Sequence, residues 1–351
     1  MEKRESSLDL LRIFAALGVT LIHYHDECAA LHSLSSLNMT ALLFLKSLGI
    51  CSVNVFLLIS GYFLINSDKR KLGKIAALIL QVSFFNLLFL AGRIILDGEV
   101  LSLKNVIAQL IPVNYFIILY AALYVISPYI NKVLHALDTS RRRLFVVIVV
   151  ILFSIYPTLL DFTQEVRGEE WWGLSTIGAW GNQQGFNIVN FVLLYCLGAC
   201  LKLDTLPERI TQKKSLLIGI SLTFIVVFIW AFSEEPMTRF GLRSAWCYHN
   251  PLVILLAVQL FALFRQFKFN NSLISQLGGA AFTSYLMNSF VLKHSAIDVY
   301  ATQSVWVMLI HYLLVAVSIY VIAVPLHKVY WFIIKPIEKR LNRKEINYFT
   351  S

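Results

Sequence analysis

Long apolar runs alternate with short polar connections along almost the whole chain. A helix needs roughly 20 mostly apolar residues to cross a bilayer core about 30 Å thick. Ten runs have the required length, so the pattern predicts an all-α, polytopic membrane protein with one membrane-embedded domain over residues 1–351. The predicted spans are 8–27, 41–65, 73–95, 114–134, 143–161, 187–203, 213–232, 250–267, 273–292 and 305–334.

Composition agrees with a lipid-facing surface. Of the 351 residues, 58% are hydrophobic and only 14% are charged, whereas a soluble domain usually carries about 25% charged residues. The net charge of +10 comes from short basic tracts between apolar runs. Such tracts are better explained by the positive-inside rule than by nucleic-acid binding. We therefore expect membrane lipid, and no nucleic acid, as a partner.

The basic tracts also predict orientation. With the amino terminus in the cytosol, the cytosolic segments hold 21 of the 30 basic residues. This bias predicts that both ends of the chain are cytosolic, in a multi-pass protein of the plasma (inner) membrane. The cytosolic set is Lys3, Arg4, Lys69, Arg70, Lys71, Lys74, Lys132, Arg141, Arg142, Arg143, Lys202, Arg209, Lys213, Lys214, Arg265, Lys268, Lys335, Lys339, Arg340, Arg343 and Lys344.

Two further features limit the possible chemistry. The five cysteines are scattered and form no CxxC pair, so neither a disulfide framework nor a metal site is expected. Asp9 and Arg12 interrupt the first apolar run, and no convincing small-residue cleavage site follows it. We therefore interpret this run as an uncleaved first helix rather than a signal peptide.

Arg12 and His23 are the candidate chemical groups of the first helix. Eleven residues at 3.6 per turn return to within about 20° of the same face, with a rise of about 16.5 Å. Ionisable groups at membrane depth are costly and usually face a bundle interior or a wet cavity. Arg12 is then a candidate anion anchor near the cytosol, and His23 a candidate general base. The simpler alternatives are an arginine that snorkels to lipid headgroups and a histidine that hydrogen-bonds a neighbouring helix.

These residues carry a family resemblance. The segment LDLLRIFAALGVTLIH (8–23), with Arg12 and His23, resembles the first-helix signature of the acyltransferase 3 family, membrane acyltransferases that modify polysaccharides. Four later segments resemble that family in the same order. They are SVNVFLLISGYFL (52–64), NYFIILYAALYVISPYIN (114–131), GFNIVNFVLLYCLGACLK (185–202) and YHNPLVILLAVQLFALF (248–264).

The resemblance implies O-acylation of a polysaccharide or lipid-linked sugar on the outer side. The donor it implies is cytosolic acyl-CoA, most often acetyl-CoA, as a co-substrate rather than a bound cofactor. His23 would be catalytic, either as the base or as a transiently acylated group. The residues expected to bind acyl-CoA are Arg12, Lys69 and Arg70. Lys71 and Lys74 in the same tract are more simply topology signals.

Three further residues are possible oxyanion or acceptor contacts: Tyr115, Tyr285 and Asn288. For the tyrosines, a packing or interfacial role is the simpler expectation. Asn288 marks a departure, because the family often has His after the Tyr-Leu-x sequence that here is Tyr285, Leu286 and Met287. An asparagine there can form hydrogen bonds but cannot transfer a proton.

Several other polar residues have a simple structural interpretation. Trp171, Trp172 and Trp180 in an outer loop are most simply an interfacial aromatic belt, with sugar stacking as the alternative. The remaining cases are Ser60 as a helix-packing residue, His25 as an exposed headgroup-level residue, His311 as a packing residue, and His249 with Asn250 as a helix cap rather than an acceptor contact.

Two other functional classes remain open from sequence alone. A transporter or flippase for a lipid-linked sugar would also have about ten helices with intramembrane charges. A catalytically inactive relative is the third possibility, for which Asn288 is the only indication.

Overall fold

The structure is a computed structural model that describes residues 5–29, 31, 34–179, 181–204, 207–234, 244–342 and 345–347. Some residues used above lie outside this described part: Lys3, Arg4, Trp180, Arg343 and Lys344.

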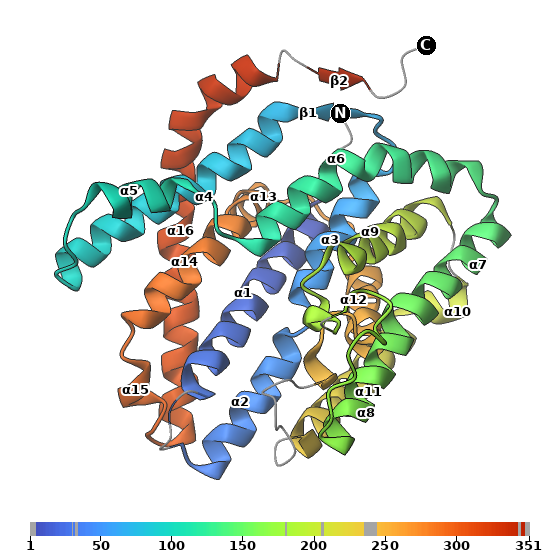
Figure 1. Ribbon diagram of the computed structural model, residues 1–351, viewed down its shortest axis with the longest axis horizontal. Helices are drawn as coiled ribbons and strands as arrows, with labels where there is room; N and C mark the ends of the chain where they lie inside the picture. Colours follow the sequence, from blue (N-terminus) through green and yellow to red (C-terminus); the bar gives the residue numbers. More distant parts are fainter. Residues whose placement is uncertain are drawn as a thin grey trace.

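The described chain is almost entirely helical (Figure 1). Its first half contains α1 (Ser6–Ala29), α2 (Ser36–Gly49), α3 (Ser52–Leu64), α4 (Leu72–Leu96), α5 (Leu103–Leu110), α6 (Tyr115–Ala136), α7 (Thr139–Val150), the π-helix η1 (Ile151–Ile155) and α8 (Tyr156–Arg167). Its second half contains the 3₁₀ turn η2 (Gln183–Gly185), α9 (Ile188–Leu203), α10 (Glu208–Thr211), α11 (Lys213–Glu234), the 3₁₀ turn η3 (Ser244–Trp246), α12 (Pro251–Phe264), α13 (Ser272–Gly279), α14 (Ala281–Lys293), α15 (Ile297–Tyr300) and α16 (Val305–Leu341).

Eight helical segments of the described chain are long and apolar enough to cross a membrane, which confirms a polytopic membrane protein. They are Ser6–Ala29, Ser36–Leu64, Leu72–Leu96, Leu103–Ala136, Thr139–Arg167, Lys213–Glu234, Ser244–Phe264 and Val305–Leu341. The other two predicted spans correspond to shorter helices. The span 187–203 is the 16-residue α9, and the span 273–292 is broken at Ala280 into α13 and α14.

A short β-ribbon was not predicted. Strand β1 (Lys69–Lys71) pairs antiparallel with β2 (Glu345–Asn347), with Arg70 opposite Ile346. The ribbon lies at the same end of the molecule as the start of α1 and the end of α16 (Figure 1). A shared end for the start of α1 and the end of α16 fits the prediction that both chain ends lie on one side of the membrane.

Helix α1 is the central helix of the bundle. It contacts α2, α3, α12, α13, α14 and α16, and its surroundings are visible in Figure 1. The break between α13 and α14 belongs to this packing, because a Cβ atom at Gly278 would lie only 2.8 Å from the Cβ atom of Asp9. The buried polar side chains of α1, among them Asp9 and Thr20, therefore face protein rather than lipid.

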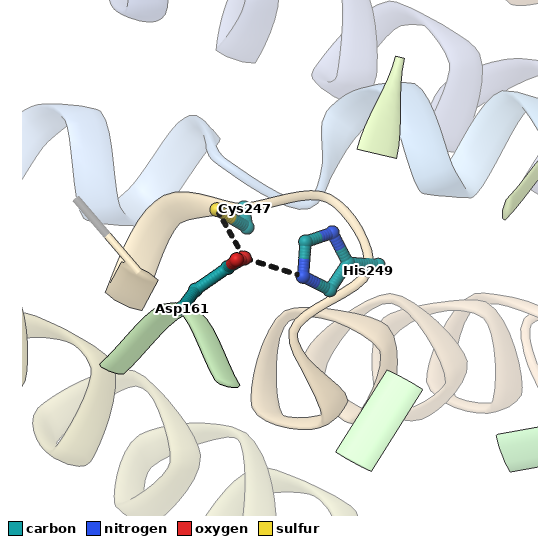
Figure 2. A group of neighbouring side chains, drawn as sticks. All are labelled: Asp161, Cys247 and His249. Carbon is teal, nitrogen blue, oxygen red and sulfur yellow. Dashed lines mark hydrogen bonds and ion pairs between the residues drawn. The ribbon is translucent and has the colours of Figure 1, made fainter. Parts of the chain in front are cut away.

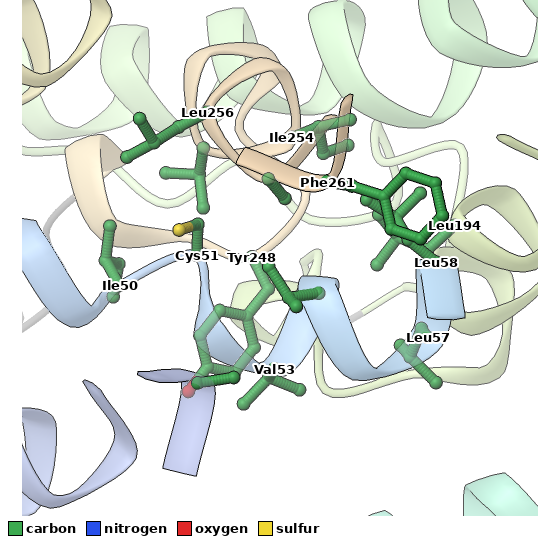
Figure 3. Close-up of a cluster of buried hydrophobic side chains, with 14 of the residues drawn as sticks. Ile50, Cys51, Val53, Leu57, Leu58, Leu194, Tyr248, Ile254, Leu256 and Phe261 are labelled. Atoms are coloured by element: carbon green, nitrogen blue, oxygen red, sulfur yellow. The ribbon is translucent and has the colours of Figure 1, made fainter. Parts of the chain in front are cut away.

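The largest buried apolar cluster joins α3, α9 and α12. Figure 3 shows part of it, including Leu58, Leu194 and Phe261. Helices α3 and α9 approach through glycine, since a Cβ atom at Gly198 would lie 2.1 Å from the carbonyl oxygen of Leu58. Small residues that allow close backbone approach are typical of membrane helix contacts.

The outer faces of peripheral helices are apolar, as lipid contact requires. On α11 the exposed side chains Ile218, Leu222, Ile225 and Ile229 are spaced at intervals of four, three and four residues. This spacing places them on one helix face. In a bilayer such a face has no solvation cost, whereas in water it would be an aggregation surface.

Candidate active site

Arg12 and His23 open onto two neighbouring cavities. Arg12 and Val19 line a cavity of about 310 Å³, named here the Arg12 cavity. His23 lines a second cavity of about 320 Å³, named the His23 cavity. Each of the two side chains thus lines a cavity, and each is only partly buried.

Tyr285 connects the two cavities. It lines both of them from α14, and its hydroxyl lies 3.2 Å from the side-chain nitrogen of Asn114. Asn114 also lines the His23 cavity and caps α6, because its side-chain oxygen accepts a hydrogen bond from the amide of Ile117. Asn114 was not predicted as a site residue, although its place just before an apolar run is a recognisable capping signal.

A third cavity extends the series toward the β1 end. It has a volume of about 300 Å³ and is lined by Lys74 and Glu338, so it is named the Lys74 cavity. Leu78 and Tyr120 line both this cavity and the Arg12 cavity. Shared lining residues therefore make the Lys74 cavity a neighbour of the Arg12 cavity, and the Arg12 cavity a neighbour of the His23 cavity.

The Arg12 guanidinium is held by protein contacts. Its Nη1 atom donates to Oδ1 of the buried Asp9 at 2.6 Å, and its Cζ atom lies 5.7 Å from the centre of the Phe63 ring. The carboxylate offsets the cost of a charge at membrane depth. About 30% of the Arg12 side chain is still exposed, so the group remains reachable by a ligand in its cavity.

Two further cations lie near Arg12. Lys202 Nζ and Arg265 Cζ lie 4.5 Å and 5.8 Å from the centre of the Tyr62 ring. Tyr62 and Phe63 are neighbours in α3, so three cations collect at the end of this helix. Neither Lys202 nor Arg265 was singled out from sequence, because both lie far along the chain from the Ser60-Gly61 motif.

Lys69 and Arg70 occupy different environments in β1. Lys69 is exposed, whereas Arg70 is almost fully buried. The Arg70 guanidinium donates to the Ser127 hydroxyl at 2.7 Å and to the carbonyl oxygens of Tyr124 and Ser67. These bonds attach the β1 segment to α6. Arg70 therefore has a sufficient structural role and is not assigned to acyl-CoA binding.

Tyr115 and Asn288 lie beside the cavities rather than between them. The Tyr115 hydroxyl hydrogen-bonds Tyr248, and its ring packs edge-on against Phe186. Asn288 is completely buried and accepts a hydrogen bond from the Thr20 hydroxyl at 2.8 Å. Asn288 therefore links α14 to α1 next to the turn that carries His23.

The outer rim of the His23 cavity is charged. Lys293 lines this cavity, and its ammonium group lies 3.0 Å from Asp97 Oδ2. His294 Nε2 lies 3.0 Å from the other carboxylate oxygen. The hydrogen bond from Lys293, followed by that from His294, lowers the pKa of Asp97 below its usual value. The carboxylate is therefore ionised at neutral pH and holds Lys293 at the rim.

Three other polar residues were interpreted from sequence as structural: His311, Asn250 and His25. His311 is confirmed as a packing residue, since it bonds Tyr24 and the Ser295 carbonyl. Asn250 is confirmed as the cap of α12. The expectation that His25 is exposed was wrong. It is buried against Trp246 and bonds Asp26 at 3.1 Å, because α2 and η3 cover this end of α1.

The loop after α8 forms a cavity of about 470 Å³, lined by Trp171, Trp172 and Glu170 among others. Trp172 is exposed, and Trp171 donates to Glu169 at 3.1 Å. This position is compatible with both interpretations of the tryptophans, an interfacial belt and a sugar-stacking surface.

Ser60, expected to be a packing residue, donates to the Phe56 carbonyl at 2.9 Å within its own helix.

Comparison with known proteins gives one match. The family model described as an acyltransferase domain, of the acyltransferase 3 family, matches residues 5–328. No curated protein and no solved structure matches the chain. The matched region contains the Arg12 and His23 cavities, the Lys74 cavity except for Trp331 and Glu338, and every residue named above as a candidate for acyl-transfer chemistry.

Proposed function

The chain belongs to the acyltransferase 3 family and is a membrane acyltransferase, and from this premise we propose that it transfers an acetyl group from acetyl-CoA to a hydroxyl of an envelope or exported sugar. The observation that carries this proposal is the series of three neighbouring cavities. Arg12 lines one of these neighbouring cavities, His23 lines another, and Tyr285 lines both of these two.

The donor enters from the β1 end in this proposal. Coenzyme A carries several phosphate charges, and Arg12, Lys202 and Arg265 form a cationic region at the end of α3. Charge-assisted hydrogen bonds from arginine to phosphate are strong and directional. The pantetheine arm then extends along the Arg12 cavity, whose lining is mostly apolar, and brings the thioester toward His23.

His23 provides the chemistry. A neutral imidazole takes the proton of the sugar hydroxyl while the hydroxyl oxygen attacks the thioester carbonyl. The carbon–sulfur bond then breaks, the coenzyme A sulfur leaves as thiolate, and the imidazolium returns the proton to it. In the alternative route, an imidazole nitrogen first accepts the acetyl group and the sugar hydroxyl takes it in a second step. Both routes use the same residue and give the same products.

Tyr285 is the proposed oxyanion donor. It lies at the junction of the Arg12 and His23 cavities, and Asn114 holds its hydroxyl in place. A preorganised hydroxyl donor stabilises the negative charge that develops on the carbonyl oxygen. Tyr115 and Asn288 are assigned supporting roles, since they hold Tyr248 and Thr20 around this junction.

The transporter alternative is less well supported. Membership of an acyltransferase family favours group transfer over transport. A histidine that lines a cavity is also placed to take part in proton or acyl transfer.

Replacement of the imidazole tests the proposal. Purified protein in proteoliposomes, given labelled acetyl-CoA and membrane glycan, should transfer label to the glycan. His23→Gln should lower this rate by about 10²-fold or more, because general-base catalysis contributes about 10²–10⁴-fold. The matched control is His135→Gln, since His135 bonds the Ile65 carbonyl at the end of α6 and lines none of the three cavities. Near-normal transfer by folded His23→Gln would contradict the proposal.

A second experiment tests the donor site. Arg12→Ala should raise the KM for acetyl-CoA by about tenfold or more, because a hydrogen bond to a charged group contributes about 1.5–3 kcal/mol. S-acetylpantetheine lacks the nucleotide, so its KM should change little. Arg141→Ala is the control, since Arg141 is largely exposed on α7. An equal loss with both donors would show that Arg12 does not recognise the nucleotide phosphates.

A further inference from the structure

A second cluster of reactive side chains lies away from the acyl-transfer path. Asp161 from α8 meets Cys247 and His249 from the segment between η3 and α12 (Figure 2). One ligand atom from each residue lies within 4.8 Å of the other two. Asp161 Oδ2 is 3.1 Å from His249 Nε2 and 3.9 Å from Cys247 Sγ.

Simple pairing does not account for this arrangement. His249 is completely buried, and neither of its ring nitrogens has a hydrogen-bond partner among the described residues, despite the close approach of Asp161. A buried polar atom without a partner costs roughly 1–3 kcal/mol. A ligand between the three side chains would satisfy the Nε2 atom and explain why it is directed at a carboxylate and a thiol.

The surrounding structure fixes each ligand in place. Asn182 donates to Asp161 Oδ1 at 2.5 Å, which leaves Oδ2 to face the cluster. The His249 carbonyl accepts a hydrogen bond from Ser154 at 2.6 Å, and the preceding amide of Tyr248 donates to Gln184. Ser154 belongs to η1, and π-helical turns of this kind frequently occur at functional sites. Metal ligands characteristically have such supporting hydrogen bonds.

The donor set identifies the class of metal. We infer that Asp161, Cys247 and His249 bind a transition-metal cation, with Zn²⁺ as the expected ion. Zinc takes sulfur, imidazole nitrogen and carboxylate oxygen ligands at about 2.0–2.3 Å, and the spacings of 3.1 Å and 3.9 Å suit a tetrahedral ion between them. A thiolate ligand disfavours Mg²⁺ and Ca²⁺, which prefer oxygen. Binding replaces the thiol proton of Cys247, which is released to solvent.

The cluster also has an entry path. Asp161 and Cys247 line the 470 Å³ cavity formed by the loop after α8, so an ion can reach the three ligands from that side. The fourth coordination position faces the cavity and is available to water or to another oxygen ligand. The ion would join α8 to the segment before α12, two elements that are about 86 residues apart in the chain. That separation is why cysteine spacing alone predicted no metal site.

The test uses the full chain purified in detergent without a histidine tag. Elemental analysis should find about one zinc per chain, and the metal should be lost from Cys247→Ala and from His249→Gln. Cys196→Ala is the matched control, because Cys196 is also a buried cysteine but lies in α9. Zinc content should be unchanged in this variant. Retention of zinc by both cluster variants would overturn the inference.

A measurement on the unaltered chain covers the case in which a cluster variant fails to fold. Removal of metal with a chelator should lower the Tm, and added Zn²⁺, but not Mg²⁺, should restore it. Cobalt in place of zinc should give a thiolate-to-cobalt charge-transfer band. A wild-type protein without stoichiometric zinc, without a Tm response to Zn²⁺ and without this band would show that Asp161 and His249 form only an ion pair. These readouts do not involve acyl transfer, so they are independent of the proposed function.

Discussion

At the scale of single residues, Tyr285 offers the most direct prediction. Its hydroxyl lies at the junction of two cavities and bonds Asn114. Tyr285→Phe keeps the ring and removes the donor, so it should lower kcat by about 10²-fold with little change in KM, as expected for a group that acts only in the transition state. Steady-state kinetics with acetyl-CoA would measure this effect.

The control for this prediction is Tyr312→Phe. Tyr312 packs edge-on against Tyr24 and lines neither the Arg12 cavity nor the His23 cavity. Its kcat should stay close to that of the wild type. A rise in KM alone for Tyr285→Phe would place this hydroxyl in substrate binding rather than in stabilisation of the oxyanion.

At this scale, sequence reasoning could relate the positions of two residues that share one helix. The spacing of Arg12 and His23 fixes their common face, and the structure places both at cavities. It could not show that Asp9 is the partner of Arg12, or that Arg70 is buried under α6. Those outcomes depend on which helices pack together, and a basic tract has the same appearance in sequence whether it binds a ligand or a backbone carbonyl.

At the scale of helices, the contact between α3 and α9 is the feature most sensitive to substitution. A Cβ atom at Gly198 would lie 2.1 Å from the Leu58 carbonyl oxygen, and backbone cannot move aside as a side chain can. Gly198→Ala should therefore destabilise the protein by about 1–3 kcal/mol, the usual cost of overpacking. A thermal unfolding assay in detergent should show a lower Tm.

Gly219→Ala provides the comparison. Its Cβ atom would meet the side-chain nitrogen of Gln259 at 2.8 Å, the end of a flexible side chain that can rotate away. The Tm of this variant should therefore remain near that of the wild type. Equal Tm values for the two variants would mean that α3 and α9 can separate without cost, contrary to their close packing.

Helix prediction was accurate for long apolar runs and less so where tertiary contacts divide a run. The span 273–292 is continuous in hydropathy, yet Gly278 packs against Asp9 and the helix breaks at Ala280. Strands β1 and β2 have three residues each and pair segments more than 270 residues apart. A hydropathy pattern describes positions that are close along the chain, so it cannot predict pairing between segments this far apart.

At the scale of the whole molecule, orientation decides which substrate enters at which end. The β1 end carries Lys69, Lys71 and Lys74, and the terminal helices α1 and α16 also lie there (Figure 1). The positive-inside rule predicts that this end lies in the cytosol. In the proposed function, acetyl-CoA is then supplied on the side of Arg12, and the rim formed by Lys293 and Asp97 faces outward.

Accessibility of single cysteines can test this orientation. The native chain, whose five cysteines are buried or half-buried, gives the baseline of labelling. Glu170→Cys lies in the exposed loop after α8, and Lys339→Cys lies near the exposed end of α16. A membrane-impermeant thiol reagent added to intact cells should label Glu170→Cys, and should label Lys339→Cys only after the membrane is opened. The reverse pattern would place Arg12 on the outer side, where no acetyl-CoA is available, and the donor path proposed here would then run in the wrong direction.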